Sequence, residues 1–258
     1  NSRTRFLVAN KYLACEDGPC LIIRWAMFNY KVKLRNLLSS VLKDSSQIKW
    51  NKEVNAQQVD YILAINEVYK KSSEVPGHII ELGTGKGRNA IIFGSILKRD
   101  SKQKIKHYFG FDSFTNYSAE DLERNENLSI ETFNYDKNTH QELLSFIDKN
   151  SLSDQVTIIK GDFKNTIKNF IEKNSKYFTA KKLIISIIYV DCNGYHAAKD
   201  SLELLKPFLA NGALIVADES KQGDETKALT DFAKENNQKV KSGIFGFNSH
   251  ISCFIKWE

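Results

Sequence analysis

From residue 78 onward, the sequence alternates between short, continuous apolar runs and longer stretches with helical periodicity. The apolar runs are HIIEL (78–82), HYFGF (107–111), QVTIIK (155–160), IISIIYV (184–190) and ALIVA (213–217). The helical stretches are Asn89–Lys98, Gln141–Asn150, Lys164–Lys173, Ala197–Leu209 and Thr226–Glu235. Continuous apolar strands alternating with helices are typical of a parallel sheet covered on both faces. The sequence therefore predicts a doubly wound α/β domain.

Three segments lie outside this alternation. Residues 1–75 show helical spacing of apolar residues, over Ile22–Leu42 and Val59–Tyr69, and predict an N-terminal helical extension beside a domain of residues 76–258. Residues 115–140 are polar and weakly periodic, which is typical of a functional lid or a disordered insertion. The tail IFGFNSHISCFIKW predicts a turn and an antiparallel end strand.

Charge, apolar content and cysteine spacing exclude several classes of protein. The formal net charge is +6, but the lysines are scattered among acidic residues, so we do not expect a nucleic-acid substrate. The early apolar stretch CLIIRWAMF is short and contains Arg24, so we expect no membrane span. Cys15, Cys20, Cys192 and Cys253 form no CxxC pair, and we expect reduced thiols in a cytoplasmic protein.

A glycine-rich segment, GTGKG, follows the first apolar run. Gly83, Gly85 and Gly87 are expected to form the turn into the next helix, with Thr84 between the first two. Glycine permits a positive φ and a close approach of ligand to backbone, and the helix N-terminus leaves free N–H groups. This arrangement predicts a nucleotide-type ligand at the edge of the sheet.

The acid before the turn narrows the choice of ligand. The spacing G-x-G-x-G differs from the G-x-G-x-x-G that cradles a pyrophosphate. A carboxylate at Glu81 repels the phosphates of a dinucleotide but attracts a cationic ligand. S-adenosylmethionine has a sulfonium and an ammonium group and no phosphate, so it fits better than the cofactor of a dehydrogenase. The alternative is a structural turn with a solvated Glu81.

Two further strand ends fit the same ligand. Asp112, followed by Ser113, ends the second strand, where a carboxylate can accept hydrogen bonds from both ribose hydroxyls. Asp162 ends the third strand and is expected to meet the adenine amino group, with Phe163 against the ring. NAD-binding proteins also place an acid at the second position, so Asp112 alone does not discriminate between the two cofactors.

These motifs together resemble a known family over residues 78 to the end. ELGTGKG, FGFD and KGDF resemble three motifs of class I S-adenosylmethionine-dependent methyltransferases. GFDSF, KGDFKNTI and YVDCNGYHAAKDSLELLKPFLANGALIVADE resemble the macrocin O-methyltransferases, which methylate sugar hydroxyls and need magnesium. The resemblance implies a mostly parallel, seven-stranded Rossmann-like sheet, and cofactor contacts at Glu81, Gly83, Gly85, Asp112 and Asp162.

The resemblance also implies a metal site. Asp191, Asp218 and Glu219 match the carboxylates that hold the metal in the macrocin group. Asp191 and Asp218 end strands that are neighbours in the family's sheet, so their tips are expected ~5 Å apart. Carboxylates that close repel unless a cation joins them, and oxygen ligands, including that of Asn193, favour Mg²⁺. Alternatively, such acids cap the next helix or contact the cofactor.

The sequence departs from the macrocin group at the acceptor side. Asn193 stands where the group has a second acid, the group's acid near His196 is missing, and the segment after GFDSF lacks its glycine- and proline-containing continuation. His140, His196 and Asp191 are the candidates for the base that removes the acceptor proton. Tyr195 either lines the acceptor pocket or packs.

We therefore predict a magnesium-assisted O-methyltransferase that uses S-adenosylmethionine to methylate a hydroxyl of a sugar, glycoside or other polyol. One alternative is a metal-independent methyltransferase acting on nitrogen or another small acceptor. Another is a methyltransferase-like partner subunit without activity. The N-terminal helices are expected to cover the active site or to form a homo-oligomer.

Overall fold

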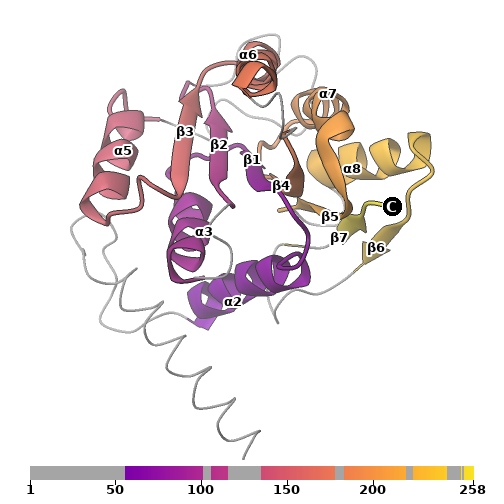
Figure 1. The fold of residues 1–258 in the computed structure, drawn as a ribbon, viewed down its shortest axis with the longest axis horizontal. Helices are drawn as coiled ribbons and strands as arrows, with labels where there is room; N and C mark the ends of the chain where they lie inside the picture. The colour runs from indigo at the N-terminus through magenta and orange to yellow at the C-terminus, as the bar shows by residue number, and fades with distance from the viewer. Residues whose placement is uncertain are drawn as a thin grey trace, which may run out of the picture. The chain divides into compact units, whose positions relative to one another are not determined.

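A computed structural model describes residues 56–100, 106–115, 135–177, 183–218, 223–242, 251 and 253–258. These residues form a seven-stranded sheet with the order β3-β2-β1-β4-β5-β7-β6 (Figure 1). The strands are β1 (His78–Leu82), β2 (Tyr108–Asp112), β3 (Val156–Lys160), β4 (Ile185–Val190), β5 (Leu209–Ala217), β6 (Val240–Ser242) and β7 (Cys253–Lys256). Strands β1 to β5 pair in parallel, and β7 is antiparallel to both β5 and β6. The predicted doubly wound sheet and the antiparallel strand of the tail are confirmed, but this strand, β7, lies between β5 and β6, and β6 forms the edge.

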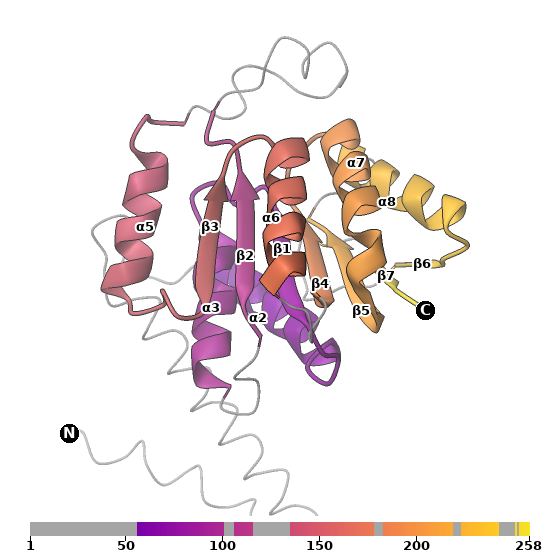
Figure 2. The same cartoon turned by 45° about the horizontal axis from the view of Figure 1, so that its top comes forward.

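Helices cover both faces of this sheet. They are α2 (Ala56–Lys71), α3 (Arg88–Arg99), α5 (Thr139–Lys149), α6 (Phe163–Tyr177), α7 (Tyr195–Leu205) and α8 (Asp224–Glu235), with a 3₁₀ turn at Lys206–Phe208. Helices α2 and α3 lie on one face, and α6, α7 and α8 lie on the other (Figure 2). Helix α5 flanks the β3 edge beside α3, where Leu143 packs on Gly87.

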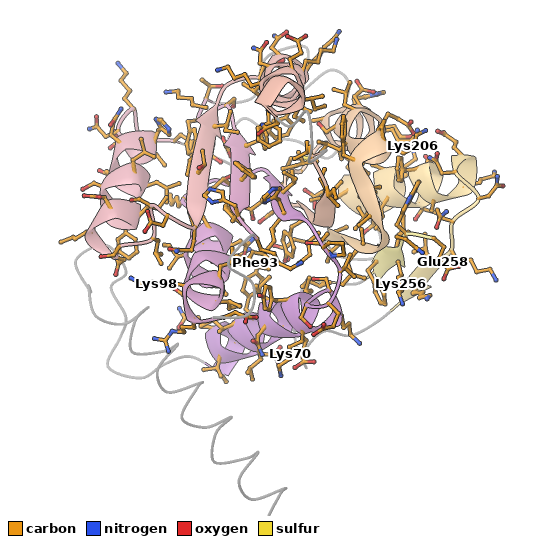
Figure 3. All side chains as sticks on the ribbon, viewed as in Figure 1. Lys70, Phe93, Lys98, Lys206, Lys256 and Glu258 are labelled. Carbon is orange, nitrogen blue, oxygen red and sulfur yellow. The ribbon has the colours of Figure 1, made fainter. Side chains whose placement is uncertain are left out.

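The two faces of the sheet differ in polarity. Side chains facing α6, α7 and α8 form an apolar core that includes Ile80, Leu82 and Ile188. The opposite face contains the rings of Tyr108 and Tyr189, and Phe93 of α3 packs against both, with ring centres 5.9 and 6.1 Å away. Phe93 is labelled in Figure 3. The hydroxyl-bearing face therefore needs hydrogen-bond partners inside the protein.

Most element ends shift by a few residues from the predictions, and two differences have a clear physical reason. The helical stretch predicted to reach Leu209 ends at Leu205, and β5 starts at Leu209, because Pro207 has no N–H to continue an α-helix. Strand β6 was not predicted, since its three residues, VKS, have no apolar run.

The remaining organisation is partly described. Helix α2 confirms the helix predicted at Val59–Tyr69, whereas Ile22–Leu42 lies outside the described residues. The predicted lid at 115–140 is described only at its two ends, and its last two residues begin α5. None of the helices that the structure describes has the length and apolarity of a membrane span. Cys192 and Cys253 are buried thiols, while Cys15 and Cys20 lie outside the described part.

Candidate active site

The turn between β1 and α3 uses glycine for two physical reasons. Gly83, Gly85 and Gly87 have positive φ values of 92°, 54° and 85°, a backbone region that favours glycine. A Cβ on Gly83 would also lie 1.9 Å from the carbonyl oxygen of Asp191, so this turn touches the end of β4. The predicted glycine turn is therefore present, and it lies beside the β1–β4 switch point of the sheet, where such folds bind ligands.

Asp112 at the end of β2 is tied directly to this turn. Its carboxylate accepts hydrogen bonds from the backbone N–H of Gly85 at 2.8 Å and of Phe114 at 2.7 Å. Burial raises the pKa of Asp112, while these two backbone hydrogen bonds act in the opposite direction. Ser113 is turned toward Thr115, whose N–H lies 3.3 Å from the Ser113 Oγ. The structure thus holds the predicted ribose acceptor against the glycine turn.

Thr84 and the β3 end have structural partners in this arrangement. Thr84 is buried, and its N–H donates to the carbonyl of Phe111 at 3.2 Å. Asp162 Oδ1 accepts a hydrogen bond from the N–H of Asn165 at 3.2 Å, which caps the start of α6. Phe163 begins α6 and packs partly against the apolar core. One oxygen of Asp162 therefore caps a helix. Helix capping is the alternative role that the sequence analysis gave for acids at strand ends.

Glu81 lies beneath the turn rather than at its surface. Its side chain is fully buried, and it accepts hydrogen bonds from Asn89 Nδ2 at 2.6 Å and from the Tyr108 hydroxyl. Burial raises the pKa of Glu81 to about 7 despite these two hydrogen bonds. Both carboxylate oxygen atoms of Glu81 are therefore engaged inside the protein, and its contact with a cationic ligand stays a prediction. Its influence on the site passes through Asn89.

Because the folded state binds the Glu81 proton more tightly than the unfolded chain, stability should depend on this residue's titration. The pKa is about 7 when folded against an ordinary value of 4.5. We expect the free energy of unfolding of the wild type, relative to Glu81→Gln, to fall by up to about 3 kcal/mol as pH rises from 4.5 to above 7. Urea unfolding of both proteins across this pH range measures the difference, and parallel profiles would contradict the assignment.

The tips of β4 and β5 bring two predicted carboxylates together around an arginine. Val190 pairs with Ala217, so Asp191 and Asp218 follow in register. Arg88 Nη2, from the first residue of α3, lies 2.8 Å from Asp218 Oδ2 and 3.5 Å from Asp191 Oδ2. The convergence of the two acids is as predicted, but the neighbouring cation is a guanidinium. Glu219, the third predicted metal ligand, lies outside the described residues.

Tyrosine and asparagine side chains connect this acid pair to the buried face of the sheet. The hydroxyl of Tyr61, from α2, lies 2.8 Å from Asn89 Oδ1 and 3.1 Å from both the Tyr189 hydroxyl and Asp218 Oδ2. Arg88 Nη2 donates to the Tyr61 hydroxyl at 2.7 Å, and its guanidinium lies 3.8 Å from the centre of the Tyr61 ring. This polar network was not predicted. Arg88 and Asn89 directly follow the glycine turn, which was the available signal, whereas nothing in the sequence places α2 over the site.

The loop after β4 is anchored by a buried acid that the sequence analysis also missed. Glu225 of α8 is 1% exposed, and its Oε1 accepts a hydrogen bond from the N–H of Asn193 at 2.5 Å. Asn193 has a positive φ of 55°. Burial and the nearby carboxylates of Asp218 and Glu225 raise the pKa of Asp191 well above its ordinary value. The loop after β4 is thus held by Glu225, and Asp191 at its start is a carboxylate with a raised pKa.

The two histidines proposed as bases lie in different surroundings. His140 packs on Phe114 with ring centres 4.7 Å apart, on the Asp112 side of the site, and burial lowers its pKa. His196 is in the first turn of α7 and contacts the Tyr195 ring edge-on at 5.1 Å. Tyr195 donates a hydrogen bond to Asp231 at 2.8 Å, which favours a packing role. Of the three candidate bases, Asp191 is the one that belongs to the acid pair itself.

Solved structures similar to this chain share its fold. CalS11, a calicheamicin methyltransferase, is 18% identical, with 94% of this chain and 95% of that chain covered and a TM-score of 0.65; a second structure names CalS11 a TDP-rhamnose 3'-O-methyltransferase. The O-methyltransferase NovP is 17% identical, with 90% and 98% covered and a TM-score of 0.58. An O-methyltransferase from Bacillus cereus in complex with S-adenosylhomocysteine is 13% identical, with 86% and 89% covered and a TM-score of 0.50.

The family comparison rests on the sequence itself. No curated protein matches the chain significantly. The family described as "Methyltransferase domain" matches residues 80–220, more than half of the chain, and this segment begins within β1 and ends just after β5. The class I S-adenosylmethionine-dependent methyltransferase predicted from the sequence is confirmed at the level of family and fold. The chain belongs to this methyltransferase domain family.

Proposed function

We propose that this enzyme transfers a methyl group from S-adenosylmethionine to a hydroxyl group of a sugar, glycoside or other small polyol. The observation on which the proposal rests is the shared edge of β2, β1, β4 and β5, where Asp112 is bonded to the glycine turn and Asp191 adjoins the same turn through Gly83. The donor-side acid therefore ends β2 and the acceptor-side acid follows β4, the two strands that flank β1. Both acids lie at the sheet edge where open α/β sheets bind ligands, so donor and acceptor can meet there.

The donor side uses groups that are already fixed. The Asp112 carboxylate accepts the ribose hydroxyls in the proposed complex, and its two backbone hydrogen bonds hold it in position. Gly87 precedes α3 without a side-chain cap, so N–H groups of the first helical turn face the ligand side. S-adenosylmethionine supplies a methyl carbon bonded to a positively charged sulfur. Transfer replaces that carbon–sulfur bond with a carbon–oxygen bond and releases the hydroxyl proton.

Asp191 is the proposed acceptor of that proton. Its pKa is raised by burial and by neighbouring carboxylates, and a carboxylate with a raised pKa is the stronger base near neutral pH. The acceptor hydroxyl then points toward the tip of β4, across the glycine turn from Asp112. His196 is the second candidate, because it begins the helix that follows the same loop. His140 belongs to the donor side by its contact with Phe114.

Magnesium was part of the sequence prediction, and the donor set gives a physical test of it. Asp191 and Asp218 converge, but the same oxygen atoms already face the Arg88 guanidinium. Within the ranges that the structure describes, no group of three or more His, Cys, Asp or Glu side chains is arranged to hold a metal ion. Asp191 and Asp218 therefore hold a guanidinium rather than a divalent ion as they stand. Glu219 lies outside the described residues, and no step of the proposed reaction uses a metal ion.

The proposed acceptor class is supported by relatives of the same fold. CalS11 is named as acting on the sugar of TDP-rhamnose, and NovP is named an O-methyltransferase. The acid pair and its tyrosine partners are suited to hydroxyl groups, because they offer several hydrogen-bonding oxygen atoms close together.

We also propose three further properties from the sequence. They are a cytoplasmic location, a homo-oligomer formed through residues 1–75 and a catalytic domain of residues 76–258.

The experiment is a transfer assay with the full chain. Methyl-labelled S-adenosylmethionine is incubated with a panel of nucleotide sugars, glycosides and other polyols, beside matched amines, and products are identified by mass spectrometry. We expect an O-methylated polyol and an equal amount of S-adenosylhomocysteine. Transfer only to amines would favour the nitrogen alternative. Binding of S-adenosylhomocysteine without transfer to any acceptor would favour a partner subunit. In a binding competition between the two cofactors, preference for NAD would favour a dehydrogenase.

A further inference from the structure

Arg88 occupies the space that the sequence assigned to a metal ion. Its Nη2 faces the Oδ2 atoms of both Asp191 and Asp218, while its guanidinium lies over the Tyr61 ring. The Tyr61 hydroxyl also accepts a hydrogen bond from the same nitrogen at 2.7 Å. Ring, hydroxyl and two carboxylates therefore hold one positive charge in place, which combines charge-assisted hydrogen bonding with a cation–π contact.

This arrangement opposes a second cation at the acid pair. The side chain of Asp218 is 4% exposed, so its charge needs a partner inside the protein, and Arg88 supplies that partner. A divalent ion on the same oxygen atoms would repel the guanidinium across a few ångströms in a partly buried site. The ion would also have to displace Arg88 from the Tyr61 ring before binding.

We propose that Arg88 is the resident cation of the acid pair and that methyl transfer in this enzyme needs no divalent metal. The inference rests on the proposed function and specifies how its acceptor site is neutralised. Arg88 acts through Asp191 and Asp218 as a positioning residue: it compensates the charge of Asp218 and leaves Asp191 to accept the proton. The arginine is 55% exposed and reaches the site from the rim, so its removal opens the acid pair to solvent ions.

The acid pair retains the chemistry for a metal once the arginine is removed. Asp218 Oδ1 is buried and has no hydrogen-bond partner in the described part of the chain. With Oδ2 released by Arg88, the two carboxylates would offer oxygen ligands of the kind that Mg²⁺ and Mn²⁺ prefer. A charge-removing substitution is therefore expected to create divalent-ion affinity, a gain that a purely structural role of Arg88 does not predict.

The test is calorimetric titration of Mg²⁺ and Mn²⁺ into the full chain saturated with S-adenosylhomocysteine. For the wild type we expect no stoichiometric site tighter than about 1 mM. Arg88→Met is expected to bind one ion at least about tenfold more tightly than the wild type. Arg88→Lys, which keeps the charge, is expected to behave like the wild type. Turnover of the wild type should be unchanged by EDTA.

Several results would overturn the inference. They are a micromolar divalent site in the wild type, activity lost in EDTA and restored by Mg²⁺, or Arg88→Met binding no more tightly than the wild type. If Arg88→Met does not fold, the wild-type titration and EDTA assay still decide. Before the metal titration, S-adenosylhomocysteine is titrated into the metal-free protein, which separates the two proposals. Failure of the protein to bind S-adenosylhomocysteine would count against the proposed function. Tight binding of a divalent ion by the wild type would count only against the role of Arg88.

Discussion

Asp112→Ala is expected to weaken the binding of S-adenosylhomocysteine by about a hundredfold or more. The carboxylate would contribute two hydrogen bonds to the ribose, each involving a charged group and worth about 1.5–3 kcal/mol. Its loss also releases the N–H groups of Gly85 and Phe114, which it holds at 2.8 and 2.7 Å. The glycine turn would lose its anchor to β2 together with its ribose contact, so both direct and organising contributions to binding disappear.

Calorimetry on the full chain measures this effect, with thermal unfolding to verify that the variant is folded. The matched control is Asp148→Ala, which removes an exposed aspartate near the C-terminal end of α5. We expect the control to bind like the wild type. If folded Asp112→Ala retained wild-type affinity, the donor would not bind at the β1–β2 edge.

Gly83→Ala is expected to prevent stable folding, or to lower the melting temperature by more than about 10 °C. The added Cβ would lie 1.9 Å from the carbonyl oxygen of Asp191 and 2.8 Å from the Cα of Cys192, and both are backbone atoms. Relief requires β1 and β4 to separate at the point where Asp191 N–H donates to the carbonyl of Leu82 at 2.8 Å. Such overlap belongs among the few substitutions that cost more than about 4 kcal/mol.

Gly212→Ala separates this steric effect from the cost of a positive φ. Gly212 has a φ of 86°, close to the 92° of Gly83, but its nearest neighbour for an added Cβ is the Val75 side chain at 3.3 Å. We expect a loss of only about 1–2 kcal/mol there. Circular dichroism melting curves of the two variants give the comparison. Equal losses would mean that backbone conformation alone, and not contact with β4, requires glycine at position 83.

The sequence was sufficient for the central strands β1, β2 and β4 because nearly all of their residues are buried. Runs such as ISIIYV do not alternate between apolar and polar residues, so they are not mistaken for half-exposed strands. They also fall between helices of the expected length. The same reasoning failed for β6, which is short, polar and paired only with β7. The end of α7 was predicted four residues too late. The helical spacing of apolar residues continues past Pro207, whereas the α-helix itself ends at Leu205.

The site was predictable where backbone geometry decides and not where packing decides. Positive φ at the glycine turn and the register of Asp191 with Asp218 follow from local pattern and sheet order. The burial of Glu81 depends on Tyr108 and Asn89 closing over it, which a single sequence does not reveal. Arg88 reaches the acid pair because α3 begins at this residue and because Tyr61 of α2 contacts its guanidinium. Neither condition can be derived from the sequence alone.

A crystal structure of the full chain with S-adenosylhomocysteine bound tests the central claim most directly. The ligand is expected across the glycine turn, with both ribose hydroxyls on Asp112 and the sulfur directed toward Asp191. Density for the ligand at any other part of the sheet, or a ribose without contact to Asp112, would contradict the proposed arrangement of donor and acceptor.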